Sequence, residues 1–239
     1  MVICIVQART GSTRLKGKVL KKILDIPMIL ITLKRLENAR YIDKLILATS
    51  DKEEDDNLYN IVKGEGYIVF RGDENNVLQR FVNCIDVYGG NTIIRITGDC
   101  PLIDPDIVDY VASYYKMHCY EYVRLDVPNS FIRGFDVEIF SREALLKTYE
   151  LSSQDKHKEH VTLFMYNNPQ YFNLGTIKGN DFYSKDYRLC VDTAEDFKLV
   201  EIIFSKFNNI FVSSREVVQF LDSNLNIAKM NQNVIQKKF

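Results

Sequence analysis

The chain has 239 residues, with 31 Lys and Arg against 32 Asp and Glu, which gives a formal net charge of −1 at pH 7. So balanced a charge argues against a protein that binds nucleic acid or other polyanions over a broad surface. The apolar fraction of 46% is ordinary for a folded domain and excludes an intrinsically disordered or collagen-like chain. A chain of this length suits one large domain, or one domain with a small lobe.

Five cysteines are scattered along the chain without a Cys-x-x-Cys pair, so neither a disulfide framework nor a zinc ribbon is expected. The apolar opening at residues 2–6 is short and lacks a basic region before it, which indicates a strand rather than a signal peptide. No run approaches the ~18–20 apolar residues of a membrane span. We therefore expect a reduced, cytoplasmic protein with neither a membrane nor a nucleic-acid partner.

Short β-branched runs alternate with amphipathic stretches through the first half of the chain. We expect strands at about 2–6, 44–49, 67–70 and 92–97, and helices at about 27–39, 55–63, 77–88 and 106–115. Pro27 suits the first position of its helix, where a missing N–H costs nothing. The alternation predicts βαβ units in a mixed, mostly parallel sheet, with a binding crevice at the carboxyl ends of the strands.

After residue 119 the expected elements change to closely spaced strands at 120–125 and 135–140, helices that begin at Arg142 and Glu159, and an extended stretch at 171–177. A last buried strand at 188–191 is followed by a helix through Phe207, with Asp192 or Thr193 as its N-cap. The polar stretch 224–239 is expected to form a peripheral helix with a loose end. We divide the single domain into a first half (1–118), a substrate-side region (119–187), a return strand and helix (188–223) and a tail (224–239).

The most informative stretch, residues 7–18, directly follows the first strand. It contains four cations, Arg9, Arg14, Lys16 and Lys18. Its glycines permit close backbone approach and positive φ, so N–H groups can face a phosphate while the cations neutralise a polyphosphate. It is not a Walker A loop, because five residues separate Gly11 from Gly17 and Val19 follows Lys18 where a hydroxyl residue is required. A solvated basic turn is the alternative.

A carboxylate, Asp99, follows the strand expected at 92–97 and points into the same crevice. Because Mg²⁺ bound to nucleotide phosphates needs only one or two protein carboxylates, Asp99 is a candidate metal ligand. The Gly-Asp pair also makes an ordinary turn, and that alternative stays open. Asp104 and Asp106 flank Pro105 as in the D-x-D of a metal-dependent glycosyltransferase, but we favour Asp104 as a helix N-cap with Pro at N1.

A second strand-end carboxylate, Asp192, occurs in the stretch 191–197. Since Asp192 ends a strand as Asp99 does, the two carboxylates could converge on one metal ion. Helix capping is the alternative for Asp192. For Glu195 and Asp196 we favour a structural role, as acidic residues that complement the dipole in the first turn of a helix.

A basic loop followed by two strand-end Asp residues resembles the cytidylyltransferases that activate sugars, the CMP-Kdo and CMP-sialate synthetases. The match is closest to their spore-coat polysaccharide branch. Members carry a loop of the type A-R-x-x-S-[TK]-R-L-P-G-K after the first strand, and residues 8–18 fit it except that Lys16 replaces Pro. The resemblance continues through 48–51, 98–103, 133–138, 159–162 and 191–196, with Ala194 where Pro is usual, and so spans nearly the whole chain.

The resemblance implies a three-layer α/β/α fold like that of the nucleotide-diphospho-sugar transferases, in a homodimer. It implies transfer of CMP from CTP to a sugar or sugar-acid hydroxyl with release of pyrophosphate, which would supply an activated sugar for polysaccharide or glycan synthesis. Matching positions assign catalysis to Arg9, Arg14, Lys18 and Asp99, and Mg²⁺ to Asp99 and Asp192. The residues expected around the nucleotide are Ala8, Arg9, Thr10, Gly11, Ser12, Arg14, Lys18, Arg71 and Asp99.

For the acceptor we expect Arg133, Asp136 and His160, because a sugar acid needs a cation for its carboxylate and a carboxylate for its hydroxyls. Two alternatives stay open. One is a sugar-phosphate nucleotidyltransferase that uses UTP or GTP, which would share the phosphate loop and differ in the base pocket and the acceptor. The other is a nucleotide-binding module that has lost turnover.

Overall fold

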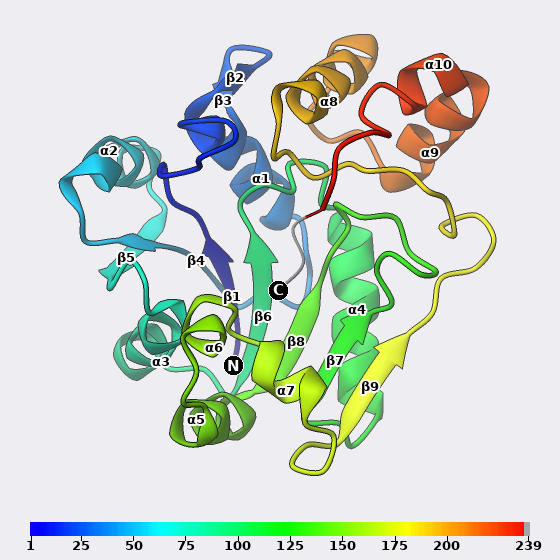
Figure 1. The fold of residues 1–239 in the computed structure, drawn as a ribbon. Coiled ribbons are helices and arrows are strands. Elements are labelled where there is room, and N and C mark those ends of the chain that lie inside the picture. The colour runs from blue at the N-terminus through cyan, green and yellow to red at the C-terminus, as the bar shows by residue number, and fades with distance from the viewer. Residues whose placement is uncertain (237–239) are drawn as a thin grey trace.

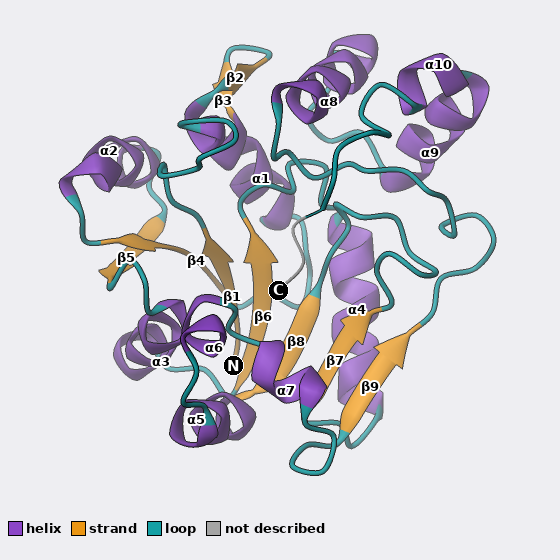
Figure 2. Cartoon of the chain, in the orientation of Figure 1, coloured by secondary structure: helices purple, strands orange, loops and turns teal. Residues whose placement is uncertain are grey.

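The computed structural model describes residues 1–236, in which seven strands form one sheet in the order β5-β4-β1-β6-β8-β7-β9 (Figures 1 and 2). The strands are β1 (Val2–Gln7), β4 (Lys44–Ser50), β5 (Ile68–Gly72), β6 (Thr92–Thr97), β7 (Tyr122–Leu125), β8 (Glu138–Ser141) and β9 (Leu174–Ile177). Neighbouring strands are parallel except for β8, which runs antiparallel to both β6 and β7. The sheet is therefore mixed and mostly parallel, as the sequence predicts.

Helices cover both faces of this sheet and complete a three-layer fold (Figure 2). The α-helices are α1 (Met28–Leu36), α2 (Asp56–Gly64), α3 (Val77–Tyr88), α4 (Pro105–Met117), α5 (Arg142–Leu151), α6 (Asp155–Glu159), α7 (Leu163–Asn167), α8 (Ala194–Phe207), α9 (Ser214–Ser223) and α10 (Leu225–Ala228). The 3₁₀ turns η1 (Lys18–Leu20) and η2 (Glu53–Asp55) and the short hairpin β2 (Lys22–Ile23) and β3 (Ile26–Pro27) lie in the connections.

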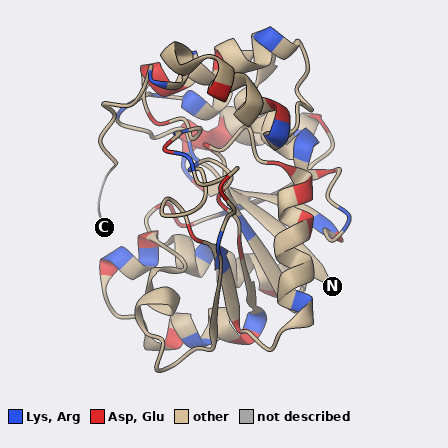
Figure 3. Cartoon of the chain, turned by 90° about the vertical axis from the view of Figure 1, so that its right-hand side faces the viewer, with Lys and Arg blue, Asp and Glu red and all other residues tan. Residues whose placement is uncertain are grey.

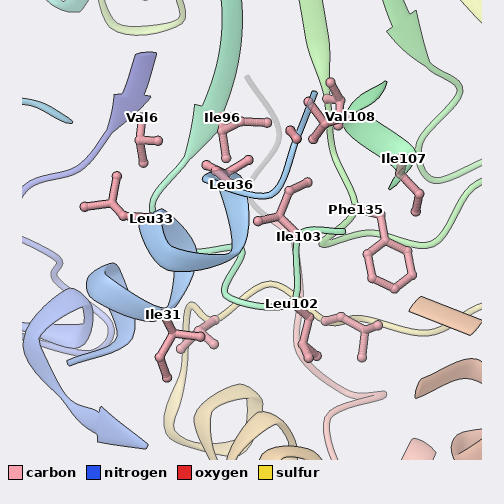
Figure 4. Packing of buried hydrophobic residues seen from close by; sticks show 14 of the residues in the cluster. Val6, Ile31, Leu33, Leu36, Ile96, Leu102, Ile103, Ile107, Val108 and Phe135 are labelled. Atoms are coloured by element: carbon pink, nitrogen blue, oxygen red, sulfur yellow. The ribbon is translucent and has the colours of Figure 1, made fainter. Parts of the chain in front are cut away.

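Alternating side chains of β1 supply two separate cores, because successive residues of a strand point to opposite faces. Val6 packs with residues of α1, α4, α8 and α9, whereas Ile5 packs on the other face with residues of α3, α5 and α7. Figure 4 shows Leu33 and Leu36 of α1 next to Val6 of β1 and Ile96 of β6. Packing on both faces fixes the positions of the strand ends, which line the crevice.

Side-chain caps fix the starts of the two helices nearest the crevice. Asp104 accepts a hydrogen bond from the Asp106 amide (2.9 Å) with Pro105 at the first position of α4, as the favoured interpretation predicts. For α8 the cap is Thr193, which forms a capping box with Asp196. Asp192 therefore precedes the helix without capping it, and its side chain is left for other contacts.

The structure departs from the expected elements in four places. Pro27 belongs to β3 and is the residue before α1, because the chain first makes the β2–β3 hairpin. The helix expected from Glu159 is broken into α6 and α7. Residues 188–191 are not a strand: within the described residues they make a single bridge, between Arg188 and Arg133. The segment resembles a buried strand in sequence because Leu189, Cys190 and Val191 are consecutive buried residues. The fourth is α9, for which no helix was expected.

The tail does not stay at the periphery. After the short helix α10 it turns back, and residues 231–236 run to the middle of the molecule (Figure 1, red). The remaining expected tail residues, 237–239, lie outside the described part of the chain.

Surface charge is mixed in sign. Figure 3 shows Lys and Arg interspersed with Asp and Glu along the helices and loops. In residues 1–236, no helix has both the length and the apolar character that crossing a membrane requires. All five cysteines are free thiols.

Candidate active site

Two adjoining cavities open at the carboxyl ends of β1 and β6. The first, of about 350 Å³, is lined by the basic loop after β1 and by the start of α3. The second, of about 330 Å³, is lined by residues of β6, β7 and β8 and by the segment before β8. The residues common to both linings, which we call the junction, are Gln7, Thr97, Asp99, His160, Asp192 and Gln236.

The basic loop is anchored from beneath by Asp55, a fully buried carboxylate. The amide and the hydroxyl of Thr10 both donate to Asp55 at 2.7 Å, and the Ala8 amide donates to the Ala48 carbonyl at 3.2 Å. Gly11, Ser12 and Arg14 then line the first cavity with Ala8, Arg9 and Lys18. Thr10 was expected at the nucleotide, but the structure places its polar groups on Asp55 instead.

The position of Asp99 depends on the glycine before it. The Gly98 amide donates to the Gln7 carbonyl at 2.9 Å, and a Cβ at Gly98 would lie 2.7 Å from the Cβ of Ala8. Only a residue without a side chain lets the ends of β1 and β6 approach this closely. The approach brings Asp99 beside the basic loop.

Lys18 connects the two carboxylates that the sequence predicts to converge. Its Nζ lies 3.1 Å from Oδ2 of Asp99 and 2.8 Å from Oδ1 of Asp192, and it donates to the Val191 carbonyl at 2.7 Å. The structure therefore brings Lys18, Asp99 and Asp192 together in a nearly buried cluster.

The surroundings of Lys18 and Asp192 favour the charged form of both groups. Burial opposes charge on Asp192, but Lys18, Arg14 and Arg188 outweigh burial and hold the pKa of this carboxyl below its ordinary value. The Arg14 and Arg188 guanidinium groups lie 2.9 and 2.6 Å from Asp192. Burial would lower the pKa of Lys18, but Asp99 and Asp192 raise it above the ordinary value.

The donor set of the cluster fits a metal ion that arrives with phosphates. Asp99 and Asp192 meet at one point, and two carboxylates are enough for Mg²⁺ when phosphates and waters supply the other ligands. The described residues contain no group of three or more His, Cys, Asp or Glu arranged to hold a metal. Asp99 and Asp192 are thus the residues that would hold such an ion.

Arg80 is a cavity residue that the sequence analysis did not identify. It lines the first cavity, is only 2% exposed, and donates from Nη1 to the Asp73 carbonyl at 3.1 Å. Its Nε has no hydrogen-bond partner among residues 1–236, and burial lowers its pKa to about 10. A signal existed in the sequence, because Arg80 occupies a core-facing position of α3 beside the buried Phe81.

Two arginines predicted to contact the nucleotide, Arg9 and Arg71, remain to be placed. Arg9 lines the first cavity and pairs with Glu74 at 2.8 Å. Arg71 lines neither cavity: it donates to the carbonyls of Ser50 and Lys52 and pairs with Asp56 at 2.7 Å. The structure thus uses Arg71 to hold the β4–α2 connection.

All three predicted acceptor residues, Arg133, Asp136 and His160, line the second cavity. Asp136 accepts from the Gly134 amide at 2.6 Å, and burial raises its pKa. Gly134 has φ +108°, and a Cβ there would lie 2.5 Å from the Leu189 carbonyl carbon, so glycine is needed for the chain to cross here. Burial also lowers the pKa of His160, which favours a neutral imidazole.

Further charged residues of the second cavity come from the strands and were also missed. Burial of Glu138 is partial and opposes its charge, yet Arg95 and hydrogen bonds from Tyr122 and Thr162 hold its pKa below the ordinary value. Arg124 lies over the Tyr166 ring at 4.6 Å and has no carboxylate partner among the described residues. A cation without a counter-ion in a cavity favours an anionic ligand.

A three-layer α/β/α fold, with a basic loop after β1 and a carboxylate after β6, is the arrangement of the nucleotidyltransferase class of folds. A family model described as cytidylyltransferase matches residues 3–223. The chain belongs to this cytidylyltransferase family, which confirms the family predicted from the sequence.

The chain is also similar to individual proteins over nearly its whole length. An uncharacterized protein of Methanocaldococcus jannaschii is 37% identical over 239 residues, covering 100% of this chain and 97% of its own. The spore coat polysaccharide biosynthesis protein SpsF of Bacillus subtilis is 34% identical over 232 residues, covering 93% and 95%. The structure of a cytidylyltransferase from Leptospira borgpetersenii matches with a TM-score of 0.90 and 29% identity, covering 100% of this chain and 98% of that one.

A more distant structure shares the fold alone. A CMP:2-keto-3-deoxy-manno-octonic acid synthetase complexed with CTP matches with a TM-score of 0.67 and 15% identity, covering 86% of this chain and 99% of that one. The three-layer fold predicted from the sequence is thereby confirmed.

Proposed function

We propose that this protein transfers CMP from CTP to a hydroxyl of a sugar or sugar acid and releases pyrophosphate. The observation that carries the proposal is the pair of adjoining cavities that share Asp99 and Asp192. One cavity is lined by the basic loop and the other by Arg133, Asp136 and His160. Two substrates held side by side at a common point are what a group-transfer reaction requires.

The first cavity suits the triphosphate. Arg9, Arg14, Lys18 and Arg80 supply positive charge, and the loop at Gly11 and Ser12 supplies backbone and hydroxyl donors. Ala8 lines the same cavity at the end of β1, and we place the cytosine near its backbone. A relative of the same fold has been solved with CTP, which supports this assignment of the first cavity. Arg71, which the sequence analysis placed around the nucleotide, lines neither cavity, and its contact with CTP stays a prediction.

In the reaction, the acceptor oxygen forms a bond to the α-phosphorus while the bond from that phosphorus to pyrophosphate breaks. Arg14 and Lys18 stabilise the negative charge that develops on the leaving pyrophosphate, as fixed charges do in a site shielded from water. Mg²⁺, when bound by Asp99 and Asp192, would neutralise phosphate charge and lower the pKa of the attacking hydroxyl. Lys18 also holds the two carboxylates in place.

The second cavity suits an acceptor that carries negative charge, because Arg124 and Arg133 face it while Arg95 is paired with Glu138. The name of the Bacillus subtilis relative supports a role in supplying activated sugar for polysaccharide synthesis. Homodimerisation and a cytoplasmic location remain predictions.

Pyrophosphate release with each of the four NTPs and Mg²⁺, against pooled sugar acids and pooled sugar phosphates, tests the proposal. We expect release with CTP alone and with one pool, and its loss in Asp99→Asn. Asp106→Asn is the matched control, since the Asp106 side chain is 83% exposed and lines neither cavity. Release with UTP or GTP would favour the sugar-phosphate nucleotidyltransferase, and CTP binding without release would favour a binding module.

A further inference from the structure

The tail of the chain contributes a residue to the junction of the two cavities. Gln236 lines both cavities, together with Asp99 and Asp192. The tail reaches this place after α10 by running back across the loops at the strand ends (Figure 1). Because the junction is where the two substrates would meet, a side chain there is positioned to contact both.

The tail is fixed to the same carboxylate that fixes the backbone of Asp192. Asn231 is 2% exposed and donates to Asp196 at 2.7 Å and to the Arg188 carbonyl at 2.9 Å. Asp196, fully buried, also accepts from the amides of Asp192 (2.9 Å) and Thr193 (3.0 Å). The anchor of the tail and the position of Asp192 therefore both depend on Asp196. The sequence analysis assigned Asp196 only the role of complementing the helix dipole.

Gln236 itself is joined to the carboxylate cluster through Arg188. Its Oε1 accepts from Arg188 Nη1 at 2.5 Å, and Nη2 of the same guanidinium lies 2.6 Å from Asp192. The Gln236 Nε2 group makes no hydrogen bond to any other residue in the described part of the chain. The side-chain oxygen is thus held by the protein while two N–H donors are left for a ligand in the junction.

We infer that Gln236 is a substrate-binding residue whose amide N–H groups donate to a substrate oxygen at the junction, on the α-phosphate or on the acceptor. The inference rests on the proposed function for the identity of the substrates. It goes beyond the basic loop and the two carboxylates, because the family model ends at residue 223 and does not include this segment.

Two substitutions separate this role from a structural one. Gln236→Glu keeps an oxygen for Arg188 and the same size, but removes the donors and adds negative charge beside the phosphates. Gln236→Ala removes both functions. Gln232→Ala is the matched control, because Gln232 lies on the same tail but is exposed and lines neither cavity.

We expect Gln236→Ala to lower kcat for pyrophosphate release by about 10-fold or more, since loss of one well-placed donor typically costs about 10²–10³-fold when it acts in the transition state. Gln236→Glu is expected to lose at least as much, and Gln232→Ala nothing. Wild-type rates in Gln236→Glu would overturn the inference and assign the residue a structural role through Arg188. Faster turnover in Gln236→Ala would also overturn it, because it would show that the tail hinders the substrates at the junction.

A binding measurement keeps this test independent of turnover. If the wild-type protein releases no pyrophosphate, the proposed function fails. The role of Gln236 is then tested by the increase in Tm that CTP and Mg²⁺ produce. We expect a smaller rise in Gln236→Glu than in Gln232→Ala, with equal Tm values in the absence of ligand. An equal rise in both variants, with CTP and Mg²⁺ alone and again with the acceptor pools added, would overturn the inference.

Discussion

Nζ of Lys18 lies 2.8 Å from Oδ1 of Asp192, although 174 residues separate the two in sequence. The contact joins the loop after β1 to the segment before α8. Gly17 makes it possible, because its φ of +64° turns the chain so that Lys18 begins a 3₁₀ turn with its side chain buried. The Lys18 ammonium group therefore holds the loop after β1 against the segment before α8.

Replacing Lys18 by Met removes the positive charge between Asp99 and Asp192. The two carboxylates then repel each other and the site loses a group that neutralises the leaving pyrophosphate, so we expect kcat to fall by about 10²–10³-fold. Steady-state pyrophosphate release measures the effect. The control is Lys16→Met, since Lys16 is exposed and lines neither cavity. Equal losses in both variants would contradict a specific role for Lys18.

Replacing Arg80 by Met removes a buried cation from the first cavity while keeping an unbranched side chain of similar length. We expect weaker CTP binding with only a modest loss of stability, because the Arg80 Nε has no partner and the side chain makes one hydrogen bond, from Nη1 to the Asp73 carbonyl. The CTP dependence of Tm measures the binding. Arg142→Met, on α5 and away from both cavities, provides the comparison. An undiminished CTP-induced rise in Arg80→Met would show that Arg80 is only part of the core.

Replacing Asp104 by Ala tests whether the residue caps a helix or binds metal. Asp104 accepts from the Asp106 amide and, across 110 residues, from the Ser214 amide at 2.5 Å, so its loss leaves both donors without a partner. We expect the free energy of unfolding to fall by about 1–3 kcal/mol. Urea denaturation measures this change. The Mg²⁺ concentration for half-maximal activity should stay at the wild-type value, and an increase would assign Asp104 to the metal instead.

Protonation of Glu138 makes the stability of the fold depend on pH. Its pKa is lower in the folded protein than in the unfolded chain, where a Glu titrates near ~4.3, so the unfolded state takes up the proton first as the pH falls. The stabilisation is complete above the unfolded pKa and is lost as the pH falls through the folded pKa.

Urea denaturation between about pH 7 and pH 3 measures this dependence. Glu138→Gln should be less stable at pH 7, because it leaves Arg95 buried without a counter-ion, and it should lose less additional stability in acid. If the free energy of unfolding fell by the same amount with pH in the wild type and in Glu138→Gln, this contribution from Glu138 would be ruled out.

Much of the nucleotide side could be predicted because it is local in sequence. The βαβ alternation, the loop of residues 8–18 and the cap of α4 at Asp104 are each contained in a short window, and the structure reproduces their positions. The sequence also predicts that Asp99 and Asp192 converge, but its reason holds only for Asp99, which follows β6. Asp192 follows a segment that is not a strand, and the Val191 amide bonds to the Asp99 carbonyl beside it.

The remainder depends on contacts that no local window contains. Leu189 and Val191 belong to a buried apolar run that is typical of a strand. Their amides, however, bond to the carbonyls of Arg133 and Asp99, which belong to two separate segments. The sequence suggests Thr10 as a phosphate ligand, but its amide and hydroxyl both donate to Asp55, which is 45 residues away in the chain. Gln236 reaches the site only because Asn231 is bound to Asp196.

The central claim is that CTP is attacked at its α-phosphorus in the first cavity by an acceptor in the second. Incubation with Mg²⁺, an acceptor pool and CTP carrying ³²P at either the α or the γ position tests this most directly. The account predicts that the α label appears in a new sugar nucleotide and the γ label in pyrophosphate, and that Asp99→Asn abolishes both. Transfer of the γ label to the acceptor, or release of the α label only as free CMP, would contradict it.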